Sequence, residues 1–359
     1  NMSRFPQPVE LDLRRFEAEL LQAGWLLPTL GQGITGTGAV MEAVVQGLIL
    51  AARERAVDLP RPGRLEAVRF PPVNARSLLE RTDYVASFPQ LLGTIDTFEG
   101  DTKAHRRLLA DREAGQPWDG HMSTSGYALV PAACHPLYGA LQLGSARGEV
   151  DGTVYSLIGD CFRNEPSPDP MRFVSFRMLE FVLVGTPEQA LAHRQAMLEL
   201  GSGLLRDLGL DVEIESANDP FFGRAGVMLA KGQLQAELKF EITAPVYGTH
   251  RTAIASGNYH EDHFGAEFDL HGADGSMAHS ACFGFGLERV ALALARVHGT
   301  ELMAWLRTRL GEPVPGVVIS ADARPELVAA IHASGLDFLA KPVKPAALRA
   351  LMSRHLTLR

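Results

Sequence analysis

The sequence predicts an α+β fold in which antiparallel strands are flanked by helices. Two alternating apolar runs, at residues 154–162 and 173–183, enclose a polar turn broken by prolines, a pattern typical of a β-hairpin. Apolar residues at helical spacing predict three amphipathic helices, over residues 10–27, 38–56 and 187–208. A strand–helix–strand–helix pattern over residues 314–359 predicts a small additional unit.

Composition limits the classes of function. The 359 residues suffice for about two domains, and the net charge of −8 argues against a generally basic nucleic-acid surface. No apolar run approaches the ~20 residues of a membrane span, and the first residues lack the apolar core of a signal peptide, so we expect a cytoplasmic protein. Cys134, Cys161 and Cys282 do not describe a disulfide framework, and we expect thiols or ligands.

A glycine-rich segment separates the first two helices. Gly31, Gly33 and Gly36 match a dinucleotide-binding pattern, but no β-branched strand precedes them and no acidic residue follows at the expected place. We interpret the segment as a flexible turn. After the second helix, residues 65–73 predict one short strand that ends at paired prolines.

The predicted hairpin aligns charged and aromatic side chains on one face. By the two-residue period of a strand, this face carries Arg163, Glu165, Arg172, Phe176 and Glu180. Arginine neutralises phosphates, an aromatic ring stacks on a base, and a carboxylate accepts from an exocyclic amine, so the face suits a nucleoside triphosphate. The alternative is a solvated hairpin with cross-strand ion pairs.

Two motifs connect the chain to a class of enzymes. The pattern RxE, a loop, then RxxxFxxxE over residues 163–180 resembles motif 2 of class II aminoacyl-tRNA synthetases, and CFGFGLER at 282–289 resembles their motif 3. The resemblance implies a class II synthetase-like antiparallel sheet flanked by helices over residues 67–311, after an N-terminal helical region at 1–66. Residues 65–73 stand where motif 1 lies, which implies a homodimer.

The resemblance also implies how ATP and magnesium are held. Arg163 would hold the α-phosphate, and Arg172 and Arg289 the outer phosphates, which makes Arg163 and Arg289 the expected catalytic residues. Glu165 would accept from the adenine amine and Phe176 would stack on the adenine face. Glu288 would help to hold Mg²⁺, which ATP chemistry generally needs.

Within this class, the chain is similar to seryl-tRNA synthetases. The segment LVPAAC at 129–134 replaces a substrate-pocket glutamate of those enzymes with Cys134. The order KFE, then SGN, resembles the segment that lines their amino-acid pocket, which implies four substrate residues: Lys239, Glu241, Ser256 and Asn258.

Cys134, Glu180 and Cys282 would project into this pocket in the fold that the resemblance implies. They match the Cys/Glu/Cys zinc site of carrier-protein ligases and of certain methanogen seryl-tRNA synthetases, so Zn²⁺ is expected, with a fourth position open for the amino group. Sequence spacing alone favours the alternative, in which the cysteines are buried as small hydrophobes. His260 and His263 form an HxxH pattern that we interpret as a polar loop.

The resemblance is greatest to amino acid:carrier-protein ligases, seryl-tRNA synthetase homologues that lack the tRNA-binding arm. About 65 residues precede motif 1, without sustained heptads. The implied activity is ATP-dependent activation of glycine or alanine to the aminoacyl adenylate, and transfer to the phosphopantetheine thiol of a small acidic carrier protein. Arg224 and Lys231, within residues 218–233, would dock the carrier; the alternative is a core-anchored helix with solvated basic residues.

Two other functions remain open at this stage. A tRNA-charging seryl-type synthetase would need an RNA-binding surface, and tRNA is not the expected partner. A catalytically inactive, synthetase-like adaptor is the second. Residues 314–359 resemble the second half of a response-regulator receiver domain without its phosphoacceptor half, so we expect an appended C-terminal βαβα receiver-like fragment.

Overall fold

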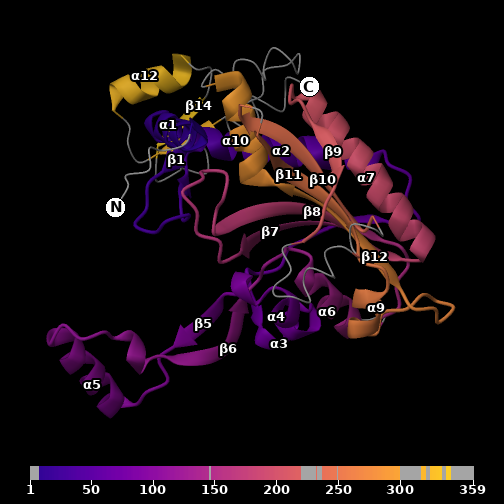
Figure 1. The fold of residues 1–359 in the computed structure, drawn as a ribbon, viewed down its shortest axis with the longest axis horizontal. Coiled ribbons are helices and arrows are strands. Elements are labelled where there is room, and N and C mark those ends of the chain that lie inside the picture. Colours follow the sequence, from indigo (N-terminus) through magenta and orange to yellow (C-terminus); the bar gives the residue numbers. More distant parts are fainter. Residues whose placement is uncertain are drawn as a thin grey trace.

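The structure is a computed structural model that describes residues 8–144, 147–219, 232, 237–248, 250–299, 317–320, 324–333 and 337–340. Within these residues, a seven-stranded sheet forms the centre of the protein (Figure 1). Strands β3 and β7 are parallel, and all other neighbours in this sheet are antiparallel. From edge to edge the strands are β3 (Leu65–Val68), β7 (Val154–Phe162), β8 (Ser175–Gly185), β12 (His279–Gly286), β11 (His250–Tyr259), β10 (Lys239–Tyr247) and β9 (Glu213–Ser216).

The central strands are buried on both faces, and alternate residues enter different cores. Phe181 and Leu183 of β8 belong to the larger hydrophobic core, whereas Val182 and Val184 belong to the smaller one. The larger core is covered by α1 (Pro8–Gln22), α2 (Ala39–Val57), α7 (Pro187–Asp207) and α10 (Leu287–His298). The smaller core is covered by α6 (His135–Leu143) and α9 (His263–Phe268).

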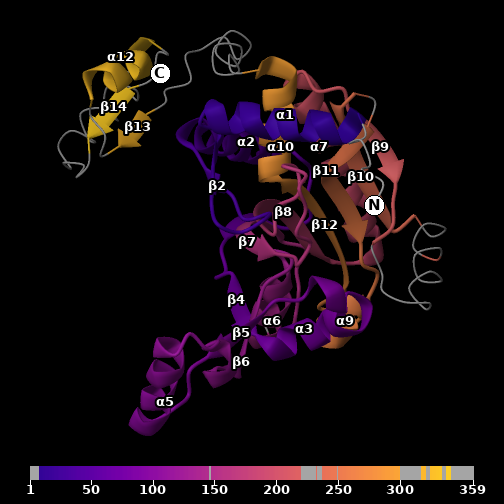
Figure 2. The ribbon, with the colours of Figure 1, turned by 60° about the vertical axis from the view of Figure 1, so that its left-hand side comes forward.

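A small second sheet carries the segment between β3 and β7. Its order is β4-β6-β5, and with α5 it extends away from the main sheet (Figures 1 and 2). The elements of this part are β4 (Val73–Ala75), α3 (Arg76–Arg81), α4 (Tyr84–Ser87), β5 (Thr94–Thr97), α5 (Thr102–Glu113) and β6 (Ser123–Leu129). No residue of α5 is buried, so this helix adds nothing to either core.

The predicted hairpin and long helices are confirmed. Strands β7 and β8 are antiparallel, with Phe162 opposite Ser175. Helix α7 begins with a capping box, in which Thr186 accepts from the backbone of Gln189 and the Gln189 side chain accepts from Thr186, just before Pro187 at the first turn. The first helix ends earlier than predicted, because Gly24 adopts φ +71° and turns the chain into β1 (Leu26–Leu27).

Two local predictions need correction. The glycine segment is more than a turn, because it links β1 to β2 (Gly36–Thr37) as a short antiparallel ribbon. The single strand predicted over residues 65–73 is wrong: β3 and β4 lie in different sheets. The paired prolines between them lack N–H donors and end the pairing of β3.

The predicted C-terminal unit is present in outline. Strands β13 (Val317–Ser320) and β14 (Asp337–Ala340) are parallel, and α12 (Pro325–Ala333) connects them. A parallel pair needs such a crossover, as the strand–helix–strand pattern predicted. The second predicted helix of this unit lies outside the described residues. The boundaries between the three predicted regions stay predictions, although α1 and α2 share the larger core with the main sheet.

Candidate active site

A cavity of about 400 Å³ lies against β8, β10, β11 and β12. Every predicted site residue within the described part of the chain lines it: Arg163, Glu165, Arg172, Phe176, Glu288, Arg289, Cys134, Glu180, Cys282, Lys239, Glu241, Ser256 and Asn258. The structure therefore brings together side chains that are up to 155 positions apart (134 to 289). Arg224 and Lys231 lie outside the described residues.

The hairpin supplies the aromatic and basic side of the cavity. The guanidinium carbon of Arg163 lies 5.5 Å from the ring centroid of Phe176, and Nε of Arg163 donates to the carbonyl oxygen of Pro131 at 3.1 Å. Arg172 lies 3.9 Å from the carboxylate of Glu165. Since both arginines and the Phe176 ring line the cavity, it suits an anion that is joined to an aromatic group.

Arg289, in the first turn of α10, adds a third positive charge. Its Nε donates to the carbonyl oxygen of Met171 at 2.9 Å and its Nη1 donates to that of Ala253 at 3.1 Å. Burial lowers the pKa of Arg289, and the positive charges of Arg172 and Arg163 lower it further. Three cations that repel one another around a buried space form a site for a polyanion.

The same cavity also holds a candidate metal site. One ligand atom from each of Cys134, Glu180 and Cys282 lies within 4.8 Å of the other two, and all three residues are buried. Glu180 and Cys282 share a face with the smaller core because both occupy even positions of β8 and β12. Cys134 immediately precedes α6.

The chemistry of these three groups fits a divalent cation that binds sulfur. Oε1 of Glu180 accepts from the backbone N–H of Ala133 at 3.0 Å, whereas the buried Oε2 has no hydrogen-bond partner in the described structure. Burial, followed by the charge of Cys282, raises the pKa of Glu180 to about 7. The hydrogen bond from Cys134 lowers the pKa of Cys282 well below its usual value, which favours a thiolate. A cation would satisfy the unpaired oxygen and the thiolate together.

Two side chains that were not predicted to contact the candidate metal ligands lie beside Cys282. Nδ2 of Asn258 and Nε2 of His260 each lie 3.5 Å from Sγ of Cys282, and Nδ1 of His260 lies 3.0 Å from Oγ of Ser280. Asn258 had been predicted as a substrate residue, and His260 as part of a polar loop. The HxxH pattern was a usable signal, but His260 contacts the sulfur of a candidate ligand instead of belonging to the ligand group.

The predicted substrate residues form facing pairs on two strands. Lys239 of β10 lies opposite Asn258 of β11, and Glu241 lies opposite Ser256. Nζ of Lys239 lies 2.6 Å from Oδ1 of Asp219 and 3.0 Å from Oε1 of Glu241. Burial lowers the pKa of Lys239, but the charges of Asp219 and Glu241 outweigh it and raise the pKa overall. Asp219 was not predicted, because no motif or residue spacing in the sequence marks it as a partner of Lys239.

Glu288, predicted to hold magnesium, is engaged with another residue. Its two carboxylate oxygens accept from Nε of Arg177 at 2.6 Å and from the backbone N–H of Arg177 at 2.8 Å. Its role at a metal stays a prediction, and in the structure its carboxylate pairs with Arg177.

The sheet, the hairpin that carries the motif 2 positions, and the glycine-rich β12 that leads into α10 define a class II aminoacyl-tRNA synthetase-like enzyme. The solved seryl-tRNA synthetase of M. kandleri, in complex with tRNASec of A. aeolicus, has this fold, with a TM-score of 0.65 and 19% identity over 87% of this chain and 62% of that chain. At this identity the likeness concerns the fold. No protein-family model matches the chain.

Two proteins of Bradyrhizobium diazoefficiens identify the family. Amino acid–acyl-carrier-protein ligase 1 is 37% identical over 276 residues, which are 76% of this chain and 82% of the relative. Amino acid–acyl-carrier-protein ligase 2 is 39% identical over 276 residues, which are 76% of this chain and 80% of the relative. The chain belongs to the family of amino acid–acyl-carrier-protein ligases. Within the described residues, no helix combines the length and apolarity needed to span a membrane.

Proposed function

We propose that the protein uses ATP to activate a small amino acid, glycine or alanine, and transfers the aminoacyl group to the phosphopantetheine thiol of a small acidic carrier protein. The observation that carries this proposal is that three arginines and the Cys/Glu/Cys group face one cavity of about 400 Å³. The names of the two Bradyrhizobium relatives, which combine an amino acid with an acyl carrier protein, support it.

The reaction has two steps. In the first, a carboxylate oxygen of the amino acid bonds to the α-phosphorus of ATP, and pyrophosphate leaves with the electron pair of the broken P–O bond. In the second, the carrier thiol, after losing its proton to solvent, bonds to the acyl carbon and AMP leaves. Both steps need alignment and charge neutralisation more than acid–base catalysis.

The side chains divide between the two substrates. Arg163 holds the α-phosphate of ATP, while Arg172 and Arg289 hold its outer phosphates. The ring of Phe176 stacks on adenine, and Glu165 accepts from its amino group. The amino acid lies among four residues of β10 and β11: Lys239, Glu241, Ser256 and Asn258.

We propose that the candidate metal is Zn²⁺, held by Cys134, Glu180 and Cys282. Two thiolates and a carboxylate are a zinc set, and the unpaired Oε2 of Glu180 supports a cation at this place. When bound, the ion would supply a Lewis-acid position for the α-amino group of the substrate. Mg²⁺ would enter with ATP, as is general for phosphoryl chemistry.

The decisive experiment is amino-acid-dependent exchange between ATP and pyrophosphate, with glycine, alanine and serine, before and after zinc chelation. We expect exchange with glycine or alanine that chelation abolishes. Radioactive amino acid should then pass to a carrier protein bearing phosphopantetheine and not to the same carrier without it. Consumption of amino acid that depends on tRNA would indicate a tRNA-charging synthetase, and no exchange with any amino acid would favour the inactive adaptor.

Carrier docking and assembly are further parts of this proposal. We propose that Arg224 and Lys231 contact the acidic carrier, so replacing both with glutamate should weaken transfer to the carrier while leaving exchange unchanged. Loss of exchange as well would contradict this assignment. The homodimer that motif 1 implies is tested by light scattering of the purified protein.

A further inference from the structure

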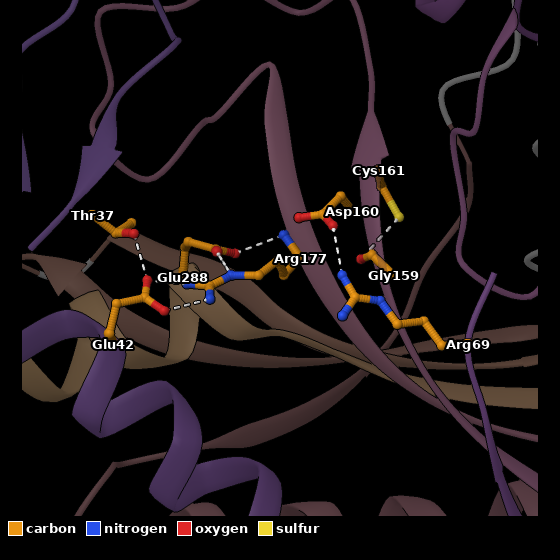
Figure 3. A network of polar contacts seen from close by, with 8 residues as sticks. All are labelled: Thr37, Glu42, Arg69, Gly159, Asp160, Cys161, Arg177 and Glu288. Atoms are coloured by element: carbon orange, nitrogen blue, oxygen red, sulfur yellow. Dashed lines mark hydrogen bonds and ion pairs between the residues drawn. The ribbon is translucent and has the colours of Figure 1, made fainter. Parts of the chain in front are cut away.

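Arg177 joins three elements of the fold through two carboxylates (Figure 3). Nη1 and Nη2 of Arg177 donate to the two oxygens of Glu42 at 2.8 Å and 2.7 Å. Nε and the backbone N–H donate to the two oxygens of Glu288 at 2.6 Å and 2.8 Å. The arginine of β8 is therefore bound by two carboxylate forks, one from the first turn of α2 and one from the first turn of α10. We call Glu42, Arg177 and Glu288 the carboxylate bridge.

Low solvent exposure and several hydrogen bonds make the carboxylate bridge rigid. The side chains of Arg177 and Glu288 are 20% and 5% exposed, so their hydrogen bonds meet little competition from water. Glu42, at 39% exposed, also accepts from Oγ1 of Thr37, which fixes its carboxylate from the N-terminal side. Burial lowers the pKa of Arg177, but Glu42 and Glu288 outweigh it and raise the pKa, so the guanidinium stays charged.

Two members of the bridge, Arg177 on β8 and Glu288 on α10, are each adjacent in sequence to a residue of the proposed ATP site. Phe176 precedes Arg177 on β8, and because strand residues alternate, the Phe176 ring faces the cavity while Arg177 faces the helices. Arg289 follows Glu288 in α10 and also lines the cavity. The hydrogen bonds from Arg177 to Glu288 therefore fix the distance between the Phe176 ring and Arg289. In the proposed function, these two side chains contact opposite ends of ATP.

From this geometry we propose that Glu42, Arg177 and Glu288 are positioning residues for ATP, through which the N-terminal segment at 37–42 controls the nucleotide site. The proposal rests on the proposed function, because it presumes that ATP lies between Phe176 and Arg289. It assigns Glu288 to Arg177 and not to magnesium. Each oxygen of Glu288 already accepts a hydrogen bond from Arg177, which leaves fewer lone pairs for a metal ion.

The test uses Glu42, the member at the solvent edge, because its removal leaves no cavity in the core. In Glu42→Ala we expect the KM for ATP in the exchange reaction to rise about tenfold, with the KM for the amino acid and the zinc content unchanged. Glu42→Gln should lie between wild type and Glu42→Ala, since its single amide oxygen still accepts from the arginine.

A matched control removes a different bond between α2 and the sheet. Nε of Arg53, also on α2, donates to Oγ of Ser156 on β7 at 2.9 Å, and neither residue lines the cavity. Arg53→Ala should lower the melting temperature without changing the KM for ATP. If Glu42→Ala instead lowers only the melting temperature, the bridge is purely structural and the inference is overturned.

If the proposed function is wrong, a binding measurement still tests the carboxylate bridge. If the wild-type protein shows no exchange, calorimetric titration with ATP still compares Glu42→Ala with wild type. Tighter or equal ATP binding by the variant would overturn the bridge, and about tenfold weaker binding would support it independently of catalysis.

Discussion

Gly284 on β12 lies directly opposite Glu180 on β8, and a Cβ atom at position 284 would stand 3.3 Å from Cγ of Glu180. The same atom would stand 3.1 Å from Cε of Met178. Both distances are shorter than ordinary van der Waals contact between carbon atoms. The absence of a side chain at Gly284 is therefore part of how the candidate metal ligand Glu180 is held in place.

Replacing Gly284 with alanine should weaken metal binding. The new methyl group displaces Glu180 by a few tenths of an ångström, and a displaced ligand is expected to lower zinc affinity by about tenfold. Competition with a chromophoric chelator measures this affinity. Gly203→Ala in α7 is the control, since no atom lies within 4 Å of its added Cβ, and it should keep wild-type affinity. Equal affinities for the two variants would contradict this prediction.

Cys282→Ser should lose most of the bound metal. A serine hydroxyl is a much poorer zinc ligand than a thiolate, so we expect affinity to fall by at least about 100-fold. Metal analysis of the purified variant gives the stoichiometry. Cys161→Ser provides the comparison: Cys161 is also buried, but its Sγ lies 3.8 Å from the carbonyl oxygen of Gly159 and outside the ligand group. Equal metal loss in both variants would argue against the assigned site.

Arg289→Lys should impair exchange while preserving charge. A lysine cannot contact the carbonyls of Met171 and Ala253 and still present a guanidinium fork to phosphate, so we expect kcat/KM to fall about 100-fold. Arg296→Lys, on the same helix, alters the ion pair with Asp12 and should affect stability alone. Wild-type exchange by Arg289→Lys would remove Arg289 from the catalytic assignment.

Acid should weaken the carboxylate bridge. Burial favours protonated Glu42, but hydrogen bonds from Arg177 and Thr37 outweigh it and lower the pKa of Glu42 below its ordinary value of 4.5. Its stabilising contribution is therefore present above pH 4.5 and disappears as the pH falls through the lower, folded-state pKa. The melting temperature of wild type should exceed that of Glu42→Gln at pH 7, and the difference should shrink toward pH 3. A difference independent of pH would contradict this account.

The elements that could be predicted are those with a local signal. The hairpin follows from the two apolar runs at residues 154–162 and 173–183 on either side of a polar turn broken by prolines, and the site residues Arg163, Phe176 and Arg289 follow from the match to motifs 2 and 3. Each of these signals is contained within one short segment of the chain, so no tertiary information is needed to detect it. The structure then shows that the motifs line one cavity.

The missed residues act across long separations in sequence. Asp219 gains its role from Lys239, 20 positions away, and Glu42 from Arg177, 135 positions away. Neither Asp219 nor Glu42 has neighbours at a regular spacing that would indicate its role in the sequence. Arg177 falls on the strand face opposite Phe176, where an isolated charge in a strand indicates only a solvated position. The sequence also did not predict that β3 and β4 lie in different sheets, because the tertiary structure determines which strands pair.

The alternation along β8 constrains how this protein can change. Phe176 and Glu180 face the cavity, while Arg177 and Phe181 face the helices. A single-residue insertion or deletion before these residues in the strand would turn the candidate metal ligand Glu180 toward the apolar core and Arg177 toward the cavity, so the site and the packing would both be disrupted. Substitutions on β10 and β11 change single side chains and leave the register of β8 intact. Under the proposed function, we therefore expect amino-acid preference to vary through substitutions on β10 and β11, with the length of β8 kept constant.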